Sequence, residues 1–440
     1  MAPPPSDTIY APATAAGRAA IAIVRLSGPD AGMALAALAG RLPPPRVAHH
    51  VRVRDPDSGE ALDDAIALWF PGPRNLTGED LAELHLHGSR AVLAAVMAAL
   101  GRRGLRLAEP GEFTRRAFLN GKLDLVQAEA VADLAAAETE AQRRQAVRQL
   151  AGHLGALYRG WGDRLLRLLA HLEAAIDFPD EDLPPEIESR VAAETASLAA
   201  EIERHLTDGH RGERLRDGIA VAILGPPNAG KSSLLNQLAR REAAITSPVA
   251  GTTRDVIEVA LDLAGYPVVL ADTAGLRDST DAVEQEGLRR ALKRADEAEL
   301  RLFVFDAACP GDARAAAAWP GSDTLIVANK IDLVGRSAAL PHGAIAVSAL
   351  TGEGIADLVR TLGSRIAERY DIAAPVLTQA RHREALEIAV AALQRSFDAG
   401  LAELRAEDLR LAWRSLGRIT GRVDVDDLLD VIFAEFCLGK

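Results

Sequence analysis

The 440-residue sequence has few cysteines, few aromatic residues and no excess of positive charge. Its two cysteines cannot build a disulfide framework, which favours a reducing compartment. Aromatic residues make up 4% of the chain and do not alternate with its basic residues, so no base-stacking RNA site is indicated. With a formal net charge of -12 the chain is not a polycation, and any contact with nucleic acid must come from local basic patches.

Long apolar runs are also missing. No run reaches the roughly 20 residues that are needed to span a bilayer. The first residues lack the basic segment and apolar core of a signal peptide. We therefore expect a cytoplasmic protein with no membrane partner. With 440 residues and 48% hydrophobic content, the chain is long enough for two or three domains, each with its own core.

The stretch from Ile219 to Ser233 is the most informative part of the sequence. The apolar run Ile219–Leu224 predicts a buried strand, and a helix is expected from about Lys231. Between them, Gly225-x-x-x-x-Gly230-Lys231-Ser232 fits a phosphate-binding loop, in which backbone N–H groups and a helix N-terminus surround phosphate oxygens. Lys231 would neutralise the terminal phosphates and Ser232 would bind Mg²⁺. A glycine-rich turn without a ligand is the alternative.

Two further motifs predict contacts to magnesium and to the terminal phosphate. Thr253, in a polar stretch, is placed to complete the magnesium shell. A predicted strand ends at Asp272, which would hold magnesium through water, and the amide of Gly275 would sense the terminal phosphate. The next residue is Leu276, where Ras-like switches carry a glutamine that orients the attacking water. Another group must therefore supply that function.

Two later motifs predict recognition of guanine. A predicted strand ends in Asn329-Lys330-Ile-Asp332, and the Asp332 carboxylate can accept two hydrogen bonds from the guanine edge that adenine does not offer. Ser348-Ala349-Leu350 ends a further predicted strand and would contact the base carbonyl through its backbone. Together with the phosphate loop, these motifs predict a GTP-binding domain.

The order of predicted elements places an α/β unit between two helical blocks. Residues 1–120 mix short strands and helices, which is an α+β pattern. Residues 121–216 and 373–440 are helical, whereas residues 217–372 alternate strands and helices as a doubly wound sheet does. Because domain termini often lie close together, we expect the helical blocks to form one discontinuous domain that carries the α/β unit as an insertion. Three domains in a row are the alternative.

Several strings make the sequence resemble one family, the tRNA modification GTPases called MnmE or TrmE, over essentially the whole chain. The strings are Asp7-Thr-Ile with Gly17-Arg18, Thr77-Gly-Glu-Asp80, Pro110-Gly-Glu-Phe-Thr114, the run from Ala117 to Leu125, Glu173-Ala-Ala-Ile-Asp-Phe-Pro179, the loop 227–233, Ala250-Gly-Thr-Thr-Arg-Asp255 and Cys437-Leu-Gly-Lys440. The resemblance implies an N-terminal domain that binds a folate and dimerises, a discontinuous helical domain and an inserted P-loop GTPase domain.

The resemblance also implies that K⁺ and pairing of two GTPase domains activate hydrolysis. It makes Asn228 a potassium ligand, and it makes Glu284 the carboxylate that orients the attacking water. A cation there would place its charge where an arginine finger does. Without the resemblance, Glu284 has the alternative interpretation of a solvated glutamate at a helix start. The further potassium ligands are expected at Ser247, Val249 and Thr252.

Taken together, the motifs and the resemblance predict one set of residues around GTP, Mg²⁺ and K⁺, with Lys231 and Glu284 in catalytic roles. The set is Asn228, Ala229, Gly230, Lys231, Ser232, Ser233, Ser247, Pro248, Val249, Ala250, Gly251, Thr252, Thr253, Asp272, Thr273, Ala274, Gly275, Asn329, Lys330, Asp332, Ser348, Ala349 and Leu350.

For the folate, which would be 5-formyl- or methylene-tetrahydrofolate, the resemblance implies a site made of Arg25, Glu83, Lys122 and Lys440. The basic groups suit glutamyl carboxylates or a formyl oxygen, and the glutamate suits the donor edge of the pterin. Each of the four is otherwise a surface charge.

The strand predicted at Leu81–His87 departs from the family pattern. The family usually reads Glu-Leu-Gln-Gly-His-Gly-Gly, whereas this chain has Glu83-Leu-His-Leu-His-Gly-Ser89, so the pocket around His85, Leu86 and Ser89 differs. Because alternate residues share one face of a strand, His85 and His87 lie on the wet face. A metal pair is one interpretation of them, and a structural role is the other.

The cysteines and the paired arginines also have alternative interpretations. By resemblance Cys437 is a functional thiol near the folate, and otherwise it is a small buried apolar residue. Cys309 is expected to be structural. The pairs Arg102-Arg103, Arg115-Arg116 and Arg143-Arg144 are either contacts to tRNA phosphates or solvated faces.

The resemblance implies a homodimer that works with a flavoprotein of the MnmG (GidA) type. The pair would install an aminomethyl or carboxymethylaminomethyl group on the wobble uridine of certain tRNAs, with a folate one-carbon unit and a conformational step driven by GTP hydrolysis. A non-enzymatic switch that docks on ribosomal RNA, as Era-like and Der-like proteins do, is the alternative. Such switches lack the Phe118-Leu-Asn-Gly-Lys122 string and the terminal cysteine motif. A folate-binding protein with unrelated chemistry is a third possibility, and the intact GTPase motifs argue against it.

Overall fold

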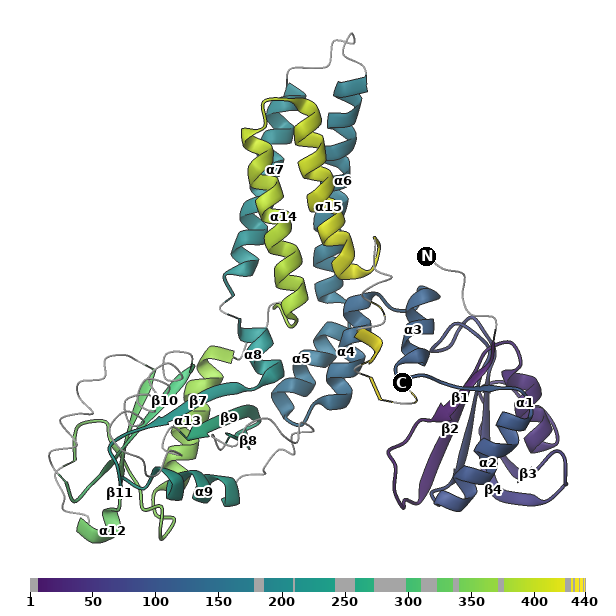
Figure 1. Ribbon diagram of the computed structural model, residues 1–440, viewed down its shortest axis with the longest axis horizontal. Coiled ribbons are helices and arrows are strands. Elements are labelled where there is room, and N and C mark those ends of the chain that lie inside the picture. The colour runs from purple at the N-terminus through teal and green to yellow at the C-terminus, as the bar shows by residue number, and fades with distance from the viewer. Residues whose placement is uncertain are drawn as a thin grey trace, which may run out of the picture. The chain divides into compact units, whose positions relative to one another are not determined.

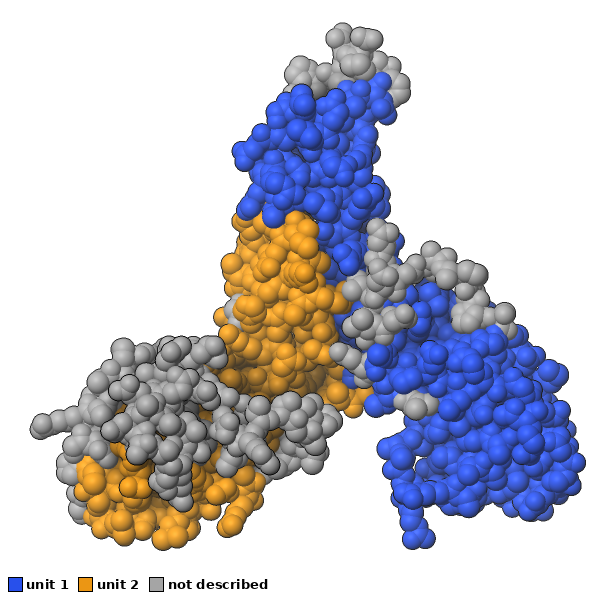
Figure 2. Space-filling view, in the orientation of Figure 1, with its two compact units in different colours: residues 1–132, 149–196, 391–440 blue, residues 133–148, 197–390 orange. Residues whose placement is uncertain are grey.

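The structure is a computed structural model that describes most of the chain. The described residues are 7–177, 186–208, 210–241, 258–272, 298–309, 323–334, 340–370 and 376–423, with 429, 432–434, 436, 437 and 439. They fall into two compact units, which are coloured separately in Figure 2. Unit 1 comprises residues 1–132, 149–196 and 391–440, and unit 2 comprises residues 133–148 and 197–390.

The first sheet, in unit 1, has one face covered by helices (Figure 1). Its strand order is β3-β4-β5-β2-β1-β6. The elements are β1 (Ile9–Pro12), β2 (Ile21–Ser27), β3 (His49–Arg54), β4 (Ala61–Phe70), β5 (Leu81–His87) and β6 (Arg106–Leu107), with α1 (Ala31–Ala39) and α2 (Arg90–Arg102). Leu84 and Leu86 of β5 lie in the core with α1 and α2, whereas Glu83 and His85 are half-buried on the other face. The strand with one wet face is confirmed.

Helices from both ends of the chain pack together in unit 1. After α3 (Glu112–Leu119) and α4 (Leu125–Ala136), α6 (His153–Asp177) lies beside α15 (Ala402–Thr420) (Figure 1). Leu165 and Leu172 of α6 and Leu416 of α15 are buried. The helical domain is therefore discontinuous, as the sequence predicted. Three further described helices of the helical blocks are α5 (Glu140–Leu150), α7 (Glu186–Leu206) and α14 (Ala380–Asp398).

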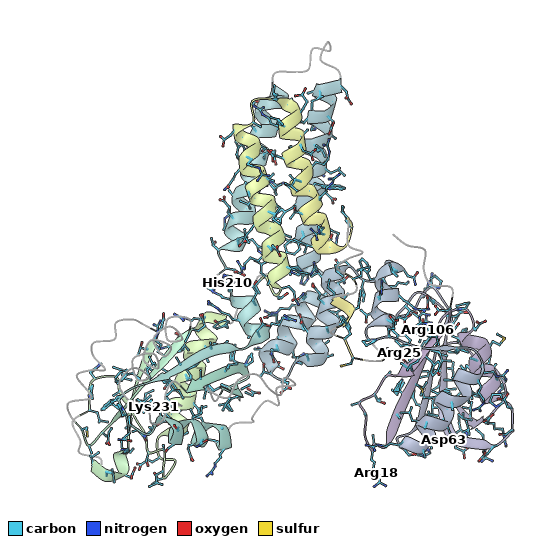
Figure 3. All side chains as sticks on the ribbon, in the orientation of Figure 1. Arg18, Arg25, Asp63, Arg106, His210 and Lys231 are labelled. Carbon is cyan, nitrogen blue, oxygen red and sulfur yellow. The ribbon has the colours of Figure 1, made fainter. Side chains whose placement is uncertain are left out.

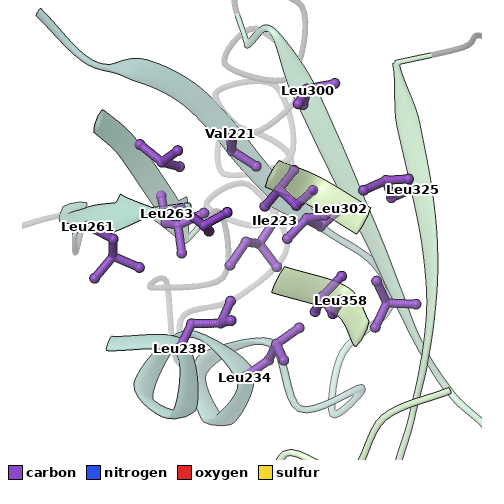
Figure 4. Packing of buried hydrophobic residues seen from close by; sticks show 14 of the residues in the cluster. Val221, Ile223, Leu234, Leu238, Leu261, Leu263, Leu300, Leu302, Leu325 and Leu358 are labelled. Carbon is purple, nitrogen blue, oxygen red and sulfur yellow. The ribbon is translucent and has the colours of Figure 1, made fainter. Parts of the chain in front are cut away.

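The second sheet, in unit 2, is doubly wound. Its strand order is β12-β11-β10-β7-β9-β8, in which only β8 runs antiparallel to its neighbour. The elements are β7 (Ile219–Leu224), β8 (Glu258–Leu263), β9 (Tyr266–Asp272), β10 (Leu300–Asp306), β11 (Thr324–Asn329) and β12 (Ile345–Ala346), with α8 (Arg211–Asp217), α9 (Lys231–Arg241), α12 (Ile331–Val334) and α13 (Ile355–Tyr370). Figure 4 shows the core, where Ile223 and Leu302 of the sheet pack with Leu234 of α9 and Leu358 of α13.

The helical stretch over residues 186–216 is divided into two helices, since α7 ends at Leu206 and α8 begins at Arg211. His210, before α8, has a φ of 58°. Left-handed backbone cannot continue a right-handed helix, so the chain must break there. None of the helices in the described part of the chain is long and apolar enough to cross a membrane.

Candidate functional sites

The predicted phosphate loop is formed by a turn between β7 and α9 that leaves no room for side chains at its glycines. Gly225 and Gly230 have φ values of 140° and 88°. A Cβ on Gly225 would lie 1.9 Å from the Val304 carbonyl oxygen, and one on Gly230 would lie 2.4 Å from Asn329 Nδ2. Only glycine fits such positions. The loop backbone is therefore free to approach a ligand closely, as phosphate binding requires.

The loop also carries the polar groups expected of it. The buried Lys231 donates hydrogen bonds from Nζ to the carbonyl oxygens of Gly225 and Pro226, both at 2.8 Å. Ser232 and Ser233 are exposed in the first turn of α9, and Asn228 is exposed with a φ of 60°. Figure 3 labels Lys231 at this end of the sheet. Ammonium, hydroxyl and amide groups therefore surround one glycine-lined turn.

The predicted guanine motifs come together around Asn329, which is 1% exposed. Asn329 Nδ2 donates to the Ala229 carbonyl of the phosphate loop at 2.8 Å, and Asn329 Oδ1 accepts the Ala349 N–H at 2.9 Å. Ser348 Oγ donates to Asp332 Oδ1 at 2.5 Å, which holds that carboxylate in place. Leu350 is exposed. One buried amide thus joins the phosphate loop to the segment that follows β12.

Part of the predicted nucleotide site lies outside the described residues. Asp272 is described as the last residue of β9 by its backbone only. The predicted residues that are not described are Ser247, Pro248, Val249, Ala250, Gly251, Thr252, Thr253, Thr273, Ala274, Gly275 and Glu284 in the nucleotide domain, and Lys440.

A second polar group lies on the half-buried face of the first sheet. Arg25 and Glu83 are register partners on β2 and β5, and Arg25 Nε donates to Glu83 Oε1 at 3.0 Å. Arg25 also donates from Nη1 to the Gly439 carbonyl at 3.2 Å, and its guanidinium carbon lies 5.7 Å from the centre of the Phe113 ring. His85 Nε2 is 3.2 Å from Glu83 Oε2. Two predicted folate residues are therefore in direct contact (Arg25 is labelled in Figure 3).

Sequence reasoning missed Phe113, Gly439 and the hydrogen bond of His85 in this group. Their contacts join segments far apart in the chain, and the only signal was the motif strings in which Phe113 and Gly439 occur. Lys122 follows α3, where its N–H donates to the Ala117 carbonyl at 2.8 Å. Its side chain lies near Gly78, since a Cβ on Gly78 would be 3.0 Å from Lys122 Cε.

A buried ion network holds α3 to the sheet. Arg116 is 1% exposed, and its guanidinium donates to Asp7 Oδ1 at 2.7 Å, Glu79 Oε2 at 3.1 Å and Glu112 Oε1 at 3.0 Å. Arg106, labelled in Figure 3, donates from Nε to Asp7 Oδ2 at 2.8 Å and from Nη2 to Glu112 Oε1 at 2.5 Å. The acidic members come from three of the strings that carry the family resemblance.

The network lowers the pKa of two of its carboxyl groups, those of Glu112 and Asp7. Burial alone would raise the pKa of Glu112, but hydrogen bonds from Arg106, the Glu109 N–H and Arg116 outweigh burial and hold that pKa below its ordinary value. Burial alone would also raise the pKa of Asp7, but the hydrogen bonds and charges of Arg106 and Arg116 bring that pKa below its ordinary value. Both groups are therefore ionised partners of the arginines at neutral pH.

Several arginines that were candidates for tRNA contact have carboxylate partners instead. Arg116 is buried in the network, so it fits neither the interpretation as a contact to tRNA phosphates nor that as a solvated face. Arg102 pairs with Asp55 and Asp57, and Glu140 pairs with both Arg143 and Arg144. These ion pairs match the interpretation as solvated faces.

Both cysteines are exposed. For Cys309, after β10, this differs from the structural role that the sequence suggested. For Cys437, it excludes the interpretation as a buried apolar residue. The Cys437 carbonyl accepts the Gly111 N–H at 3.5 Å, so this segment lies at the start of α3. Among the described residues, no cluster of three or more His, Cys, Asp or Glu side chains has the geometry of a metal site. The metal interpretation of His85 and His87 therefore lacks further ligands there.

Comparison with known proteins finds similarity along the whole chain. The family model described as "GTP-binding protein TrmE N-terminus" matches residues 8–122, and the model described as "MnmE helical domain" matches residues 125–437. The tRNA modification GTPase MnmE of Rhodospirillum rubrum is 58% identical, covering 99% of each chain. The protein of the same name from Paramagnetospirillum magneticum is 60% identical, covering 99% of this chain and all of its own length.

Among solved structures, the G domain of the T. maritima FeoB iron transporter is 23% identical and covers 34% of this chain and 98% of its own. Its TM-score of 0.24 is too low to carry an argument.

Proposed function

This chain belongs to the MnmE family of tRNA modification GTPases and is a GTP hydrolase, and we propose that it uses GTP turnover to modify certain tRNAs at the 5-position of the wobble uridine. The product is an aminomethyl or carboxymethylaminomethyl group, and a tetrahydrofolate supplies the one-carbon unit. The chain works as a cytoplasmic homodimer with an MnmG-type flavoprotein. Similarity to MnmE proteins along 99% of the chain is the observation that carries this proposal.

In the GTP step, the residues of this chain bind and orient the nucleotide. The turn has no side chain at Gly225 and Gly230, and it brings backbone N–H groups to the phosphate oxygens. Lys231 exchanges the two loop carbonyls for oxygens of the terminal phosphates. Asp332, fixed by Ser348, accepts hydrogen bonds from the guanine edge. These contacts select GTP and position it for attack by water.

The loop fits the ions that the family uses. Ser232 offers an exposed hydroxyl for Mg²⁺, and Asn228 offers an exposed amide oxygen for K⁺, both of which are oxygen ligands that hard cations prefer. Thr253 and Asp272 complete the proposed magnesium set, and Ser247, Val249 and Thr252 complete the potassium set. When bound, the ions neutralise charge on the phosphate oxygens. Glu284 orients the attacking water. Ras-like switches use a glutamine for this, but this chain has Leu276 at that position.

The face around Arg25 fits a folate. A half-buried guanidinium beside a carboxylate and an aromatic ring provides donors for carboxylates, an acceptor for the pterin donor edge, and an apolar surface. Lys122 and Lys440 supply two further charges. Cys437 exposes its thiol in the segment that also supplies the Gly439 carbonyl to Arg25. We propose that this segment closes one side of the folate site.

The potassium proposal is tested by the rate of steady GTP turnover. In KCl the full-length protein should hydrolyse GTP roughly tenfold faster or more than in NaCl, because the cation supplies charge that an arginine finger would. The Asn228→Ala variant should lose this difference and keep its sodium rate. Equal wild-type rates in the two salts would contradict the assignment of Asn228.

The tRNA proposal is tested by nucleoside analysis of tRNA from a strain in which the gene is deleted. The modified wobble uridines should disappear and return with the wild-type gene, but not with Lys231→Ala or Arg25→Ala. Unchanged nucleosides in the deletion strain would point to the ribosomal RNA switch instead.

A further inference from the structure

Asp306, the last residue of β10, has no role in the site described so far. It is the register partner of Asn329 in the parallel pair of β10 and β11. Asp306 Oδ2 lies 2.7 Å from Lys330 Nζ, and Asp306 Oδ1 accepts the Ala308 N–H at 2.9 Å. Both oxygens therefore have defined partners, and one of these is the lysine of the guanine motif.

The backbone of Lys330 is also unusual. Its φ is 65°, which is left-handed backbone that a residue with a side chain adopts only when its surroundings hold it there. The preceding residue, Asn329, is fixed by Ala229 and Ala349. The ion pair with Asp306 then sets the direction of the Lys330 side chain. The pair is half-buried, with 32% and 16% of the two side chains exposed, so water screens it less than a surface pair.

The chemistry of Asp306 agrees with this geometry. Burial alone would raise the pKa of its carboxyl group, but the hydrogen bonds from Lys330 and the Ala308 N–H and the lysine charge bring it below its ordinary value. Asp306 is therefore ionised at neutral pH and remains a partner for the ammonium group.

We propose that Asp306 is a positioning residue of the nucleotide site, which holds the Lys330 ammonium so that the aliphatic stem forms a wall of the purine pocket. Its role is to slow nucleotide release. Because Asp306 contacts neither the phosphate loop nor Asp332, it acts equally on GTP and GDP and leaves the preference for guanine to Asp332. This inference is independent of the tRNA, folate and potassium proposals, and it concerns only the binding of nucleotide.

The test is a double-variant cycle in the full-length protein, with release of a fluorescent GDP analogue followed by stopped flow. Asp306→Asn keeps an acceptor for the Ala308 N–H but loses the charge, and Lys330→Met keeps the apolar stem but loses the ammonium. Asp306→Asn should release GDP about fivefold faster or more, as expected for a lost half-buried charge pair. The double variant should be no faster than Lys330→Met alone, since the pair acts as a unit. Asp357→Asn, which removes an exposed pairing with Arg360 on α13, is the matched control and should behave as wild type.

The measurements separate this role from a merely structural one. The release rates of GDP and of a GTP analogue should rise by the same factor in Asp306→Asn, and the preference for GTP over ATP should stay. The proposal would be overturned if Asp306→Asn released GDP at the wild-type rate. It would also be overturned if the effects of the two substitutions on the release rate multiplied in the double variant. If Asp306→Asn folds poorly, Lys330→Met alone tests the proposal. An unchanged GDP release rate in that variant would show that the ammonium group and its carboxylate partner do not affect nucleotide release.

Discussion

At the scale of single residues, the nucleotide site depends as much on missing side chains as on those present. Gly230 combines left-handed backbone with a position that Asn329 already fills. A methyl group there would push away the amide that joins the phosphate loop to the guanine motif. The absence of a side chain at Gly230 therefore preserves both the backbone of the phosphate loop and the position of Asn329.

We expect Gly230→Ala to weaken GTP binding roughly tenfold or more, because left-handed backbone costs an L-residue about 1–2 kcal/mol before the clash is added. Titration with a fluorescent GTP analogue measures the effect. Gly343→Ala is the control, because Gly343 also has left-handed backbone, with a φ of 80°, but has open space around it. Similar losses in both variants would mean that backbone strain, and not the contact with Asn329, sets the affinity.

The buried network gives a pH-dependent prediction for unit 1. The folded-state pKa of Glu112 is lowered from its ordinary value of 4.5, so its stabilisation is present above that value and is lost as pH falls toward the folded pKa. Glu112→Gln should lower the free energy of unfolding by about 3 kcal/mol at pH 7, the cost of breaking a buried ion pair. The difference from wild type should shrink in acid. Urea unfolding of unit 1 at several pH values measures both effects.

The control for that prediction is Glu109→Gln, which removes the same charge from an exposed side chain on the same segment. It should change the free energy of unfolding little at any pH. A difference between Glu112→Gln and wild type that stays constant as the pH falls would rule out the ionised pair as its source.

Sequence patterns are most informative where the interacting residues are close in sequence. The phosphate loop was predicted from the residues alone, because glycines, lysine and serine act within one turn. The burial of Arg116 was not predicted, because its partner Asp7 lies 109 positions away and a sequence pattern does not show that pairing. Arg25 and Glu83, 58 positions apart, were found only through the family resemblance.

At the scale of elements, α3 connects the ion network to the proposed folate site. Arg116 and Glu112 hold it to the sheet, and Phe113 places its ring at Arg25. Gly111 and Gly121 flank the helix with φ values of 69° and 66°. Only Gly111 is crowded, because a Cβ there would lie 2.7 Å from the Phe433 carbonyl oxygen, whereas a Cβ on Gly121 meets nothing within 4 Å.

This asymmetry makes Gly111→Ala and Gly121→Ala a matched pair. We expect Gly111→Ala to displace the segment that carries Cys437 and Gly439 and to weaken binding of 5-formyl-tetrahydrofolate roughly tenfold, since a lost charge-assisted contact costs about 1.5–3 kcal/mol. Gly121→Ala should bind almost as wild type does. Calorimetric titration of the full-length proteins measures both, and equal affinities would remove this segment from the folate site.

Most strands and helices followed from apolar periodicity and from glycine and proline positions. The break between α7 and α8 was not predicted, although the pair Asp208-Gly209 between the two helices is a turn signal in the sequence. The next residue, His210, has left-handed backbone.

At the scale of the whole molecule, the two sets of proposed binding residues belong to separate compact units. Arg25 and Glu83 lie in unit 1, and the phosphate loop and Asn329 lie in unit 2. The insertion was predicted because helical blocks flank an α/β pattern, and the packing of α6 on α15 confirms the discontinuous helical domain. Sequence could not show how binding in one unit affects the other.

Because the two sets of residues lie in separate units, we expect a variant of one set to leave the activity of the other set unchanged. Arg25→Ala should lose folate binding and keep potassium-stimulated GTP turnover, whereas Asn228→Ala should lose the stimulation and keep folate binding. Both should fail to restore modified uridine in the deletion strain, since the proposed reaction needs both steps. Titration calorimetry, GTP turnover and nucleoside analysis provide the three readouts. Loss of folate binding in Asn228→Ala would contradict independent sites.

The hydrogen bond from Arg25 to the Gly439 carbonyl spans 414 positions of the chain. A ribosome makes the arginine 414 residues before the glycine. During synthesis the first sheet can fold and wait, but this contact has no partner until residue 439 has left the exit tunnel. A nascent chain stalled short of that point would already have its GTP-binding fold, whereas the proposed folate site would still lack the Gly439 segment.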